Sequence, residues 1–131
     1  MNLQDKIRSF ILSNFVPSAV RTVGMEEECF IYTMDNRRLP VNPCGEFSAS
    51  DLLSIMNENV GNNGIYSLEP GGQLEWSSPP YHNLHTLFSA FSKHKQALME
   101  VVGTNNLKII NYGVEPNFSP DDIDLIDQLK Y

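Results

Sequence analysis

Carboxylate and amide side chains recur at even spacing in the stretch Tyr66–Ser77. Glu69, Gln73 and Glu75 are separated by four and two residues. Side chains of a strand alternate between its two faces, so these three share one face and the apolar residues between them take the other. The Pro-Gly-Gly at 70–72 is predicted to bend or bulge a single strand. One face of this stretch therefore carries two acids and an amide.

A second stretch, Val20–Tyr32, carries two more carboxylates with the same alternation. Glu26 and Glu28 lie two residues apart, which is about 6.6 Å along a strand. The alternate face is apolar except for Glu27, a charge that a place at a sheet edge would accommodate. We therefore expect Glu26 and Glu28 to point away from the core.

Pairing of the two stretches would bring four acids together on one face: Glu26, Glu28, Glu69 and Glu75. Four facing carboxylates repel one another unless a counter-charge is present. Divalent cations with oxygen ligands supply that charge, and Mg²⁺ often binds together with a substrate phosphate. We predict that these four glutamates are metal ligands. The alternative is that each is an exposed glutamate on a solvated strand face.

The remaining elements follow from apolar spacing and from turn residues. Helices are predicted over residues 3–15, 48–58 and about 81–102, and a further helix start is predicted at 119–122. Strands are predicted over residues 20–34, 66–77 and 107–114, with a polar turn at 35–38. The helix over 3–15 is interpreted as a packing helix rather than as a membrane anchor or a partner-binding helix.

These elements indicate an α+β fold, in which a mostly antiparallel sheet carries its helices on one face. The length of 131 residues favours one domain with one core. The acidic face has no predicted cover. We expect it to be covered by a missing partner, by a missing C-terminal portion, or by a second copy in a homo-oligomer.

Charge and hydropathy exclude several function classes. The net charge of −7, from 16 acids and 9 bases, argues against binding to duplex nucleic acid or to an anionic membrane surface. No apolar run approaches the length of a transmembrane helix. The N-terminus lacks the features of a signal peptide. We expect a cytoplasmic protein with two reduced thiols, Cys29 and Cys44, although a disulfide between them is the alternative.

The basic side chains are given structural interpretations. The histidines are predicted to be surface or helix-cap residues, because none has a carboxylate at ligand spacing: His82, His85 and His94. Arg37 and Arg38 lie in the polar turn, where binding of a phosphate is possible in principle but a solvated turn is the favoured interpretation.

The acid-bearing stretches resemble a known family. Gly24-x-Glu26-x-Glu28, followed by Ser67-Leu68-Glu69-Pro70-Gly71-Gly72-Gln73-Leu74-Glu75 and then Leu84-His85, is similar to the N-terminal part of the glutamate–cysteine ligases of the plant and proteobacterial type. The first motif is weak by itself and the second is specific. The resemblance covers about residues 20 to 115 and implies one domain over 1–131 that is the N-terminal part of a longer catalytic domain with a glutamine-synthetase-like fold.

The resemblance also implies an activity. Such enzymes use ATP to phosphorylate the side-chain carboxylate of glutamate, and the amine of cysteine then attacks to give γ-glutamylcysteine, the first step towards glutathione. It implies that Glu26, Glu28, Glu69 and Glu75 hold Mg²⁺ and that Gln73 shapes the substrate end. Because the family chain is considerably longer, this chain alone is expected to be inactive. Two alternatives are a related ligase with another amine acceptor and a free-standing, non-catalytic module that binds a metabolite or a partner protein.

Overall fold

The computed structural model describes residues 2–15, 17, 20–59, 64–115, 119 and 124–126. The elements in chain order are α1 (Leu3–Ser13), β1 (Glu26–Thr33), α2 (Ala49–Asn59), β2 (Ile65–Glu69), β3 (Gln73–Ser77), α3 (Leu84–Thr104) and β4 (Leu107–Ile110). The predicted strand over 107–114 is therefore shorter than expected. The predicted helix start at 119–122 lies mostly outside the described residues.

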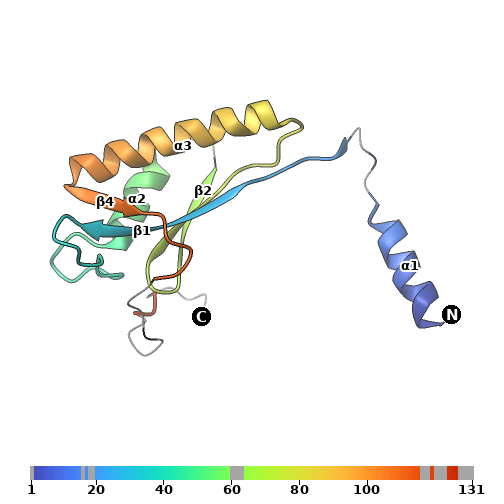
Figure 1. The fold of residues 1–131 in the computed structure, drawn as a ribbon, viewed down its shortest axis with the longest axis horizontal. Coiled ribbons are helices and arrows are strands. Elements are labelled where there is room, and N and C mark those ends of the chain that lie inside the picture. The colour runs from blue at the N-terminus through green and yellow to red at the C-terminus, as the bar shows by residue number, and fades with distance from the viewer. Residues whose placement is uncertain are drawn as a thin grey trace.

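Four described strands form one sheet in the order β2-β3-β1-β4, and every neighbouring pair is antiparallel. α2 and α3 lie together on one side of this sheet, and α3 runs the length of it (Figure 1). The expected α+β class is confirmed, and α2 and α3 lie on one face of the sheet as expected, whereas α1 does not. β1 is central, because its first half pairs with β3 and its second half pairs with β4.

The stretch 66–77 is a β-hairpin, so the prediction of one bent strand is wrong. Gly72 N–H donates to the Glu69 carbonyl at 2.9 Å, and Gly71 has a φ of +84°. A type II turn favours proline at its second position and needs glycine or asparagine at its third, because the third position has a positive φ. A three-residue connection places residue 69 opposite residue 73. Odd-numbered residues of both strands consequently keep one face, as they would in a single strand.

The core lies between the sheet and the two helices. Trp76 and Leu74 of β3 are buried against Leu52 and Met56 of α2 and Leu98 of α3, each at most 1% exposed. Leu74 and Trp76 lie on the face of the sheet opposite the acids. Burying a large apolar side chain contributes about 1.5–3 kcal/mol, so this layer is the main stabilising layer of the molecule.

Local sequence signals set the ends of α2 and α3. Ser48 caps α2, because its hydroxyl accepts from Asp51 N–H at 3.2 Å and the Asp51 carboxylate accepts in return from Ser48 N–H at 2.9 Å. Asn83 caps α3 by accepting from Thr86 N–H at 2.8 Å. The two predicted helices therefore exist, and α3 begins three residues later and ends two residues later than expected.

The outer edge of β2 is occupied by a side chain of α2. The Asn57 side-chain amide donates to the Tyr66 carbonyl at 3.3 Å, and its oxygen accepts from Tyr66 N–H at 3.2 Å. A side-chain amide thus takes the place that a neighbouring strand would have at this residue.

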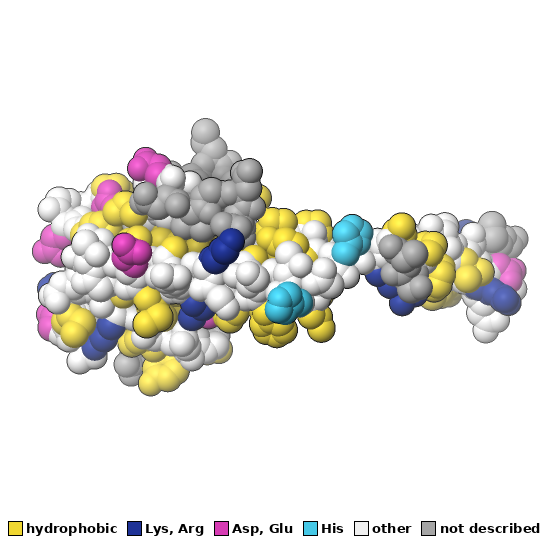
Figure 2. Space-filling model, turned by 90° about the horizontal axis from the view of Figure 1, so that it is seen from above, with side chains coloured by type: hydrophobic (Ala, Val, Ile, Leu, Met, Phe, Trp, Pro, Cys, Tyr) yellow, Lys and Arg dark blue, Asp and Glu magenta, His cyan; other side chains and the backbone are white. Residues whose placement is uncertain are grey.

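α1 stands apart from the sheet in both views (Figure 1 and Figure 2). A capping box at Asn2 and Asp5 starts the helix, as its sequence favours. It buries none of its residues, and Leu3 and Phe10 are about 70% exposed. The prediction of a packing helix is therefore wrong within the described chain. None of the described helices combines the length and the apolar character needed to cross a membrane.

The hairpin turn makes Gly72 a sensitive position. Its φ is +77°, and a Cβ there would lie 3.0 Å from Val41 Cγ2, whereas Gly45 has a φ of +93° with nothing within 4 Å. We expect Gly45→Ala to cost about 1 kcal/mol of unfolding free energy through backbone strain alone. Gly72→Ala should cost about 2 kcal/mol, because crowding adds to the strain. Urea unfolding measures both, and equal losses would contradict the close approach at Gly72.

Candidate functional site

Glutamates of β1 and β3 face one another on the side of the sheet away from α2 and α3. The register places Glu28 directly opposite Glu75 and Glu26 opposite Ser77. Opposite residues of an antiparallel pair have Cβ atoms about 4.5–5.5 Å apart. Two like charges therefore meet across the strands, with Glu28 exposed and Glu75 half-buried.

The hairpin adds the remaining two predicted residues to the same face. Glu69 lies opposite Gln73 at the end of the hairpin, and both are half-buried. The Gln73 side-chain amide donates to Glu28 Oε2 at 2.9 Å. The structure thus arranges the five predicted residues along one surface, here called the acidic strip: Glu26, Glu28, Glu69, Gln73 and Glu75.

Neutral donors are the partners of the acidic strip. Glu75 Oε1 accepts from the hydroxyls of Ser67 at 3.1 Å and Ser77 at 3.0 Å. In the described part of the chain, no ion pair joins a lysine or arginine to any glutamate of the strip. Among the described residues, no direct ion pair therefore neutralises the charge of the strip.

The glutamates form a strip and not a closed cluster. Across residues 2–15, 17, 20–59, 64–115, 119 and 124–126, no three acidic, histidine or cysteine side chains are grouped so that they could hold a metal ion. Mg²⁺ commonly uses one or two carboxylates and takes its other ligands from water and substrate phosphates. The pair Glu28 and Glu75 fits that mode, and the metal-binding role of the four acids stays a prediction.

The open face is partly covered, so the expectation of no cover within this chain is wrong at one end. Phe30 and Tyr32 continue the same face of β1 and are buried. The Tyr32 hydroxyl donates to the Glu115 carboxylate, and the Arg38 guanidinium lies 6.0 Å from the centre of the Phe30 ring. Beside them is a cavity of about 170 Å³ lined by Phe30, Arg38, Pro70, Gln73, Gly113, Val114 and Glu115. The acidic strip therefore ends against a walled pocket.

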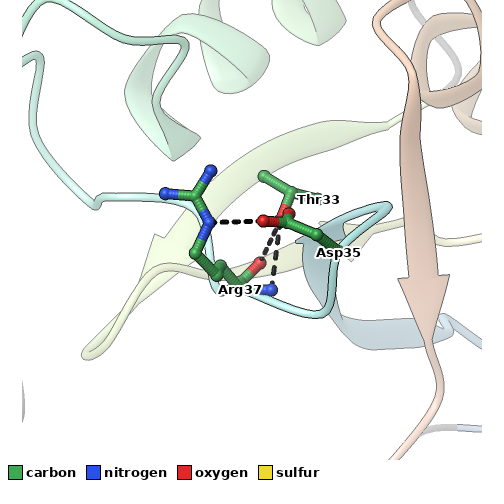
Figure 3. Close-up of polar contacts among 3 residues, drawn as sticks. All are labelled: Thr33, Asp35 and Arg37. Atoms are coloured by element: carbon green, nitrogen blue, oxygen red, sulfur yellow. Dashed lines mark hydrogen bonds and ion pairs between the residues drawn. The ribbon is translucent and has the colours of Figure 1, made fainter.

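The two arginines of the turn are engaged by protein atoms. Arg37 Nε donates to Asp35 Oδ2 at 2.8 Å, and Thr33 Oγ1 donates to the other oxygen of the same carboxylate at 2.5 Å (Figure 3). These bonds lower the pKa of Asp35, with the Thr33 bond as the largest cause. Arg38 donates to the carbonyl of Gly71 in the hairpin turn. The interpretation of 35–38 as a solvated polar turn is in accord with the exposure of residues 35–37, but it is wrong for Arg38, which is half-buried against the hairpin turn.

His94 was wrongly expected at the surface. Its side chain is 2% exposed, and its Nε2 lies 2.6 Å from Glu27 Oε2 while its Nδ1 lies 2.7 Å from the Tyr66 hydroxyl. Lys95 Nζ donates to the second Glu27 oxygen at 2.8 Å. Glu27 does face the covered side, as alternation predicts, and two basic groups of α3 meet its charge.

Two sequence signals could have located this network. Glu27 is the one charged residue in an alternating apolar series along β1, and His94 falls at helical spacing in the apolar stripe that includes Leu87 and Leu98. A charge and an imidazole placed singly on two facing apolar surfaces are expected to pair, because a buried charge without a partner is costly. The pairing depends on which helix covers which strand, which spacing alone does not give.

The other predicted structural residues lie as expected. His82 and His85 are exposed, and exposed histidine side chains are visible on the α3 side in Figure 2. Cys29 and Cys44 are free thiols, the first buried and the second exposed. Burial raises the pKa of Cys29 to about 12, so this thiol is protonated and unreactive near neutral pH.

Comparison with known proteins gives one family. Residues 22–131 match the family model of glutamate–cysteine ligase family 2. Relatives include chloroplastic glutamate–cysteine ligases B and A of Oryza sativa subsp. japonica, each 24% identical over 144 aligned residues. The alignments cover 98% of this chain and 28% of each relative. The chain thus spans somewhat more than a quarter of the length of these curated relatives.

Removing one charge from the facing pair should stabilise the chain in the absence of metal. Glu28→Gln keeps an acceptor for Gln73 but ends the repulsion with Glu75, so we expect a gain of about 0.2–1 kcal/mol in unfolding free energy. Glu26→Gln, which faces Ser77, is the control with the same change of charge and should gain less. Urea unfolding at low salt measures both. Equal gains, or a loss at position 28, would contradict the facing of the two acids.

Burial of His94 should make stability depend on pH. Desolvation lowers the pKa of His94 below its ordinary value of 6.5, although the hydrogen bond and charge of Glu27 oppose this. The unfolded chain then binds the proton more readily, so stability is full above about pH 7.5 and falls as the pH drops through 6.5. His94→Gln should flatten this slope in unfolding measurements, and His85→Gln should not. An unchanged slope in His94→Gln would refute the assignment.

Proposed function

This chain belongs to the glutamate–cysteine ligase family, and from that membership we propose that it is the N-terminal portion of an ATP-dependent ligase that joins glutamate to cysteine. The substrates of the whole enzyme are then glutamate, cysteine and ATP, and the product is γ-glutamylcysteine, a precursor of glutathione. The names of the relatives support this reaction, and the acidic strip supplies a surface suited to phosphate chemistry. A cytoplasmic location is proposed from the sequence, whereas the relatives named above are chloroplastic.

The observation that carries the proposal is the facing pair of Glu28 and Glu75, whose hydrogen-bond partners in the described part of the chain are all neutral. A pair of carboxylates held opposite each other is unfavourable in the free chain. Hard oxygen donors of this kind are the ligands that Mg²⁺ prefers. The residues present therefore fit the ion that the proposed reaction requires.

The reaction places specific demands on these side chains. The γ-carboxylate oxygen of glutamate takes the γ-phosphoryl group of ATP and releases ADP, and the amine of cysteine then displaces inorganic phosphate to form the amide. Bound Mg²⁺ would neutralise charge on the phosphate oxygens during the transfer. Glu28 and Glu75 would hold the ion between them, and Glu26 and Glu69 would add carboxylates on either side along the strip. The hydroxyls of Ser67 and Ser77 orient the Glu75 carboxylate.

Gln73 is placed to connect the metal ligands with the substrate end. Its amide nitrogen donates to Glu28 Oε2, and its side chain also lines the cavity beside Phe30 and Arg38. We assign it the role of fixing the Glu28 carboxylate and forming one wall of the substrate pocket. The cationic phosphate contacts and the remaining pocket walls are assigned to the part of the relatives that this chain does not span.

Calorimetric titration of Mn²⁺ and Mg²⁺ into the chain, with and without ATP, tests the metal site. We expect binding that weakens at least about tenfold, or about 1.4 kcal/mol, in Glu26→Gln/Glu75→Gln. The matched control is Glu58→Gln/Glu100→Gln, which makes the same charge change on exposed helix positions and should bind like the unaltered chain. An equal loss of metal affinity in both double variants would contradict a specific site and show that binding depends only on overall negative charge.

Activity is tested in a longer chain that includes the segment found in the relatives. We expect ADP release that depends on glutamate and cysteine and that fails in Glu28→Gln. Substitution of other amines for cysteine identifies the acceptor, and a faster reaction with another amine would favour the related-ligase alternative. A longer chain that is folded and releases no ADP with any amine would favour the non-catalytic alternative.

A further inference from the structure

One row of side chains crosses three strands on the helix-covered face of the sheet. Glu27 of β1 lies opposite Trp76 of β3, which lies opposite Tyr66 of β2. This row lies between the two open-face rows that contain Glu26 and Glu28. Whatever holds the row together therefore also holds the backbone that carries those two acids.

A single imidazole from α3 spans this row. The His94 ring stacks on Trp76 with centroids 4.5 Å apart and planes 3° from parallel. Its Nε2 reaches Glu27 on one side and its Nδ1 reaches the Tyr66 hydroxyl on the other. A carboxylate only accepts, so Nε2 carries the proton and Nδ1 accepts from Tyr66 O–H. The neutral ring satisfies both neighbours at once.

The start of β1 needs such an anchor because its charges oppose pairing. Residues 26 to 29 pair with β3, whereas pairing with β4 begins at Phe30. Three successive glutamates occupy this half of the strand, and Glu75 faces the third of them. Of these three, only Glu27 contacts basic side chains among the described residues: Lys95 forms an ion pair with it, and His94 Nε2–H donates a hydrogen bond to it.

We propose that His94 is a positioning residue that holds the start of β1 against β3 and so keeps Glu26 and Glu28 beside Glu75. The proposal rests on the proposed function for what those acids bind. The holding of the strand itself requires no metal, so it can be tested apart from that function.

Amide hydrogen exchange of the 131-residue chain, followed by NMR, tests the anchor. His94→Phe keeps an aromatic ring over Trp76 and removes both hydrogen bonds. We expect exchange of the bonded amides of residues 26–28 to accelerate about tenfold more than that of residues 30–33, because the loss opens one end of the strand. Phe91→Leu is the matched control, since Phe91 also packs on Trp76 from α3 without a hydrogen bond, and it should accelerate both groups equally.

The proposal would be overturned if His94→Phe accelerated amide exchange equally at residues 26–28 and 30–33, or left exchange unchanged. A residue that only fills the core has no local effect at residues 26–28. His94→Gln, whose amide can still donate to Glu27, should restore most of the protection at 26–28. If His94→Phe fails to fold, Tyr66→Phe serves instead by removing the hydroxyl that fixes Nδ1. In Tyr66→Phe, exchange at residues 26–28 should again accelerate more than at residues 30–33, by a smaller factor than in His94→Phe. Equal acceleration of the two groups would again overturn the proposal.

Mn²⁺ titration separates this inference from the proposed function. We expect His94→Phe to bind Mn²⁺ about tenfold more weakly than the unaltered chain, whereas Phe91→Leu binds like it. Unchanged affinity in His94→Phe would contradict the positioning role. A different outcome is that the His94 variants show the local exchange pattern while the unaltered chain binds no Mn²⁺. That outcome would contradict the proposed metal site and support the positioning role.

Discussion

Antiparallel pairing of β1 with β3 is the constraint on which the rest of the structure depends. The pairing sorts successive residues into two opposite surfaces, with Cys29 and Trp76 beneath the helices and Glu28 and Glu75 on the other side. A shift of one residue would exchange the surfaces and bury the acids. The apolar layer and the acidic strip are therefore two results of one register, and neither can form without the other.

Alternation of residue types along the chain predicted much of this arrangement. It failed where contacts between distant segments determine the structure. The face shared by Glu69, Gln73 and Glu75 was correctly inferred even though the hairpin was missed, because a three-residue turn preserves odd and even positions. The turn itself was signalled by Pro70 and Gly71. Such residues suit both a bend and a reversal of direction, and the antiparallel pairing of β2 with β3 shows that the chain reverses.

Other features depended on contacts between distant segments. Glu27 and His94 are separated by 67 residues, so no local pattern links them. The cover over Tyr32 comes from Glu115, which follows the end of β4. α1 has the apolar spacing of a packed helix, and spacing states which side is apolar without stating what lies against it. Periodicity predicted the elements, whereas tertiary contacts determined which of them meet.

Asn57 has a consequence for the behaviour of the protein in concentrated solution. A strand at the edge of a sheet offers free N–H and C=O groups that can pair with another molecule and begin aggregation. At Tyr66, both of these groups are already bonded to the amide of Asn57. An incoming strand would have to displace that amide before it could extend the sheet at β2. A single polar residue on α2 thus opposes intermolecular sheet growth at Tyr66.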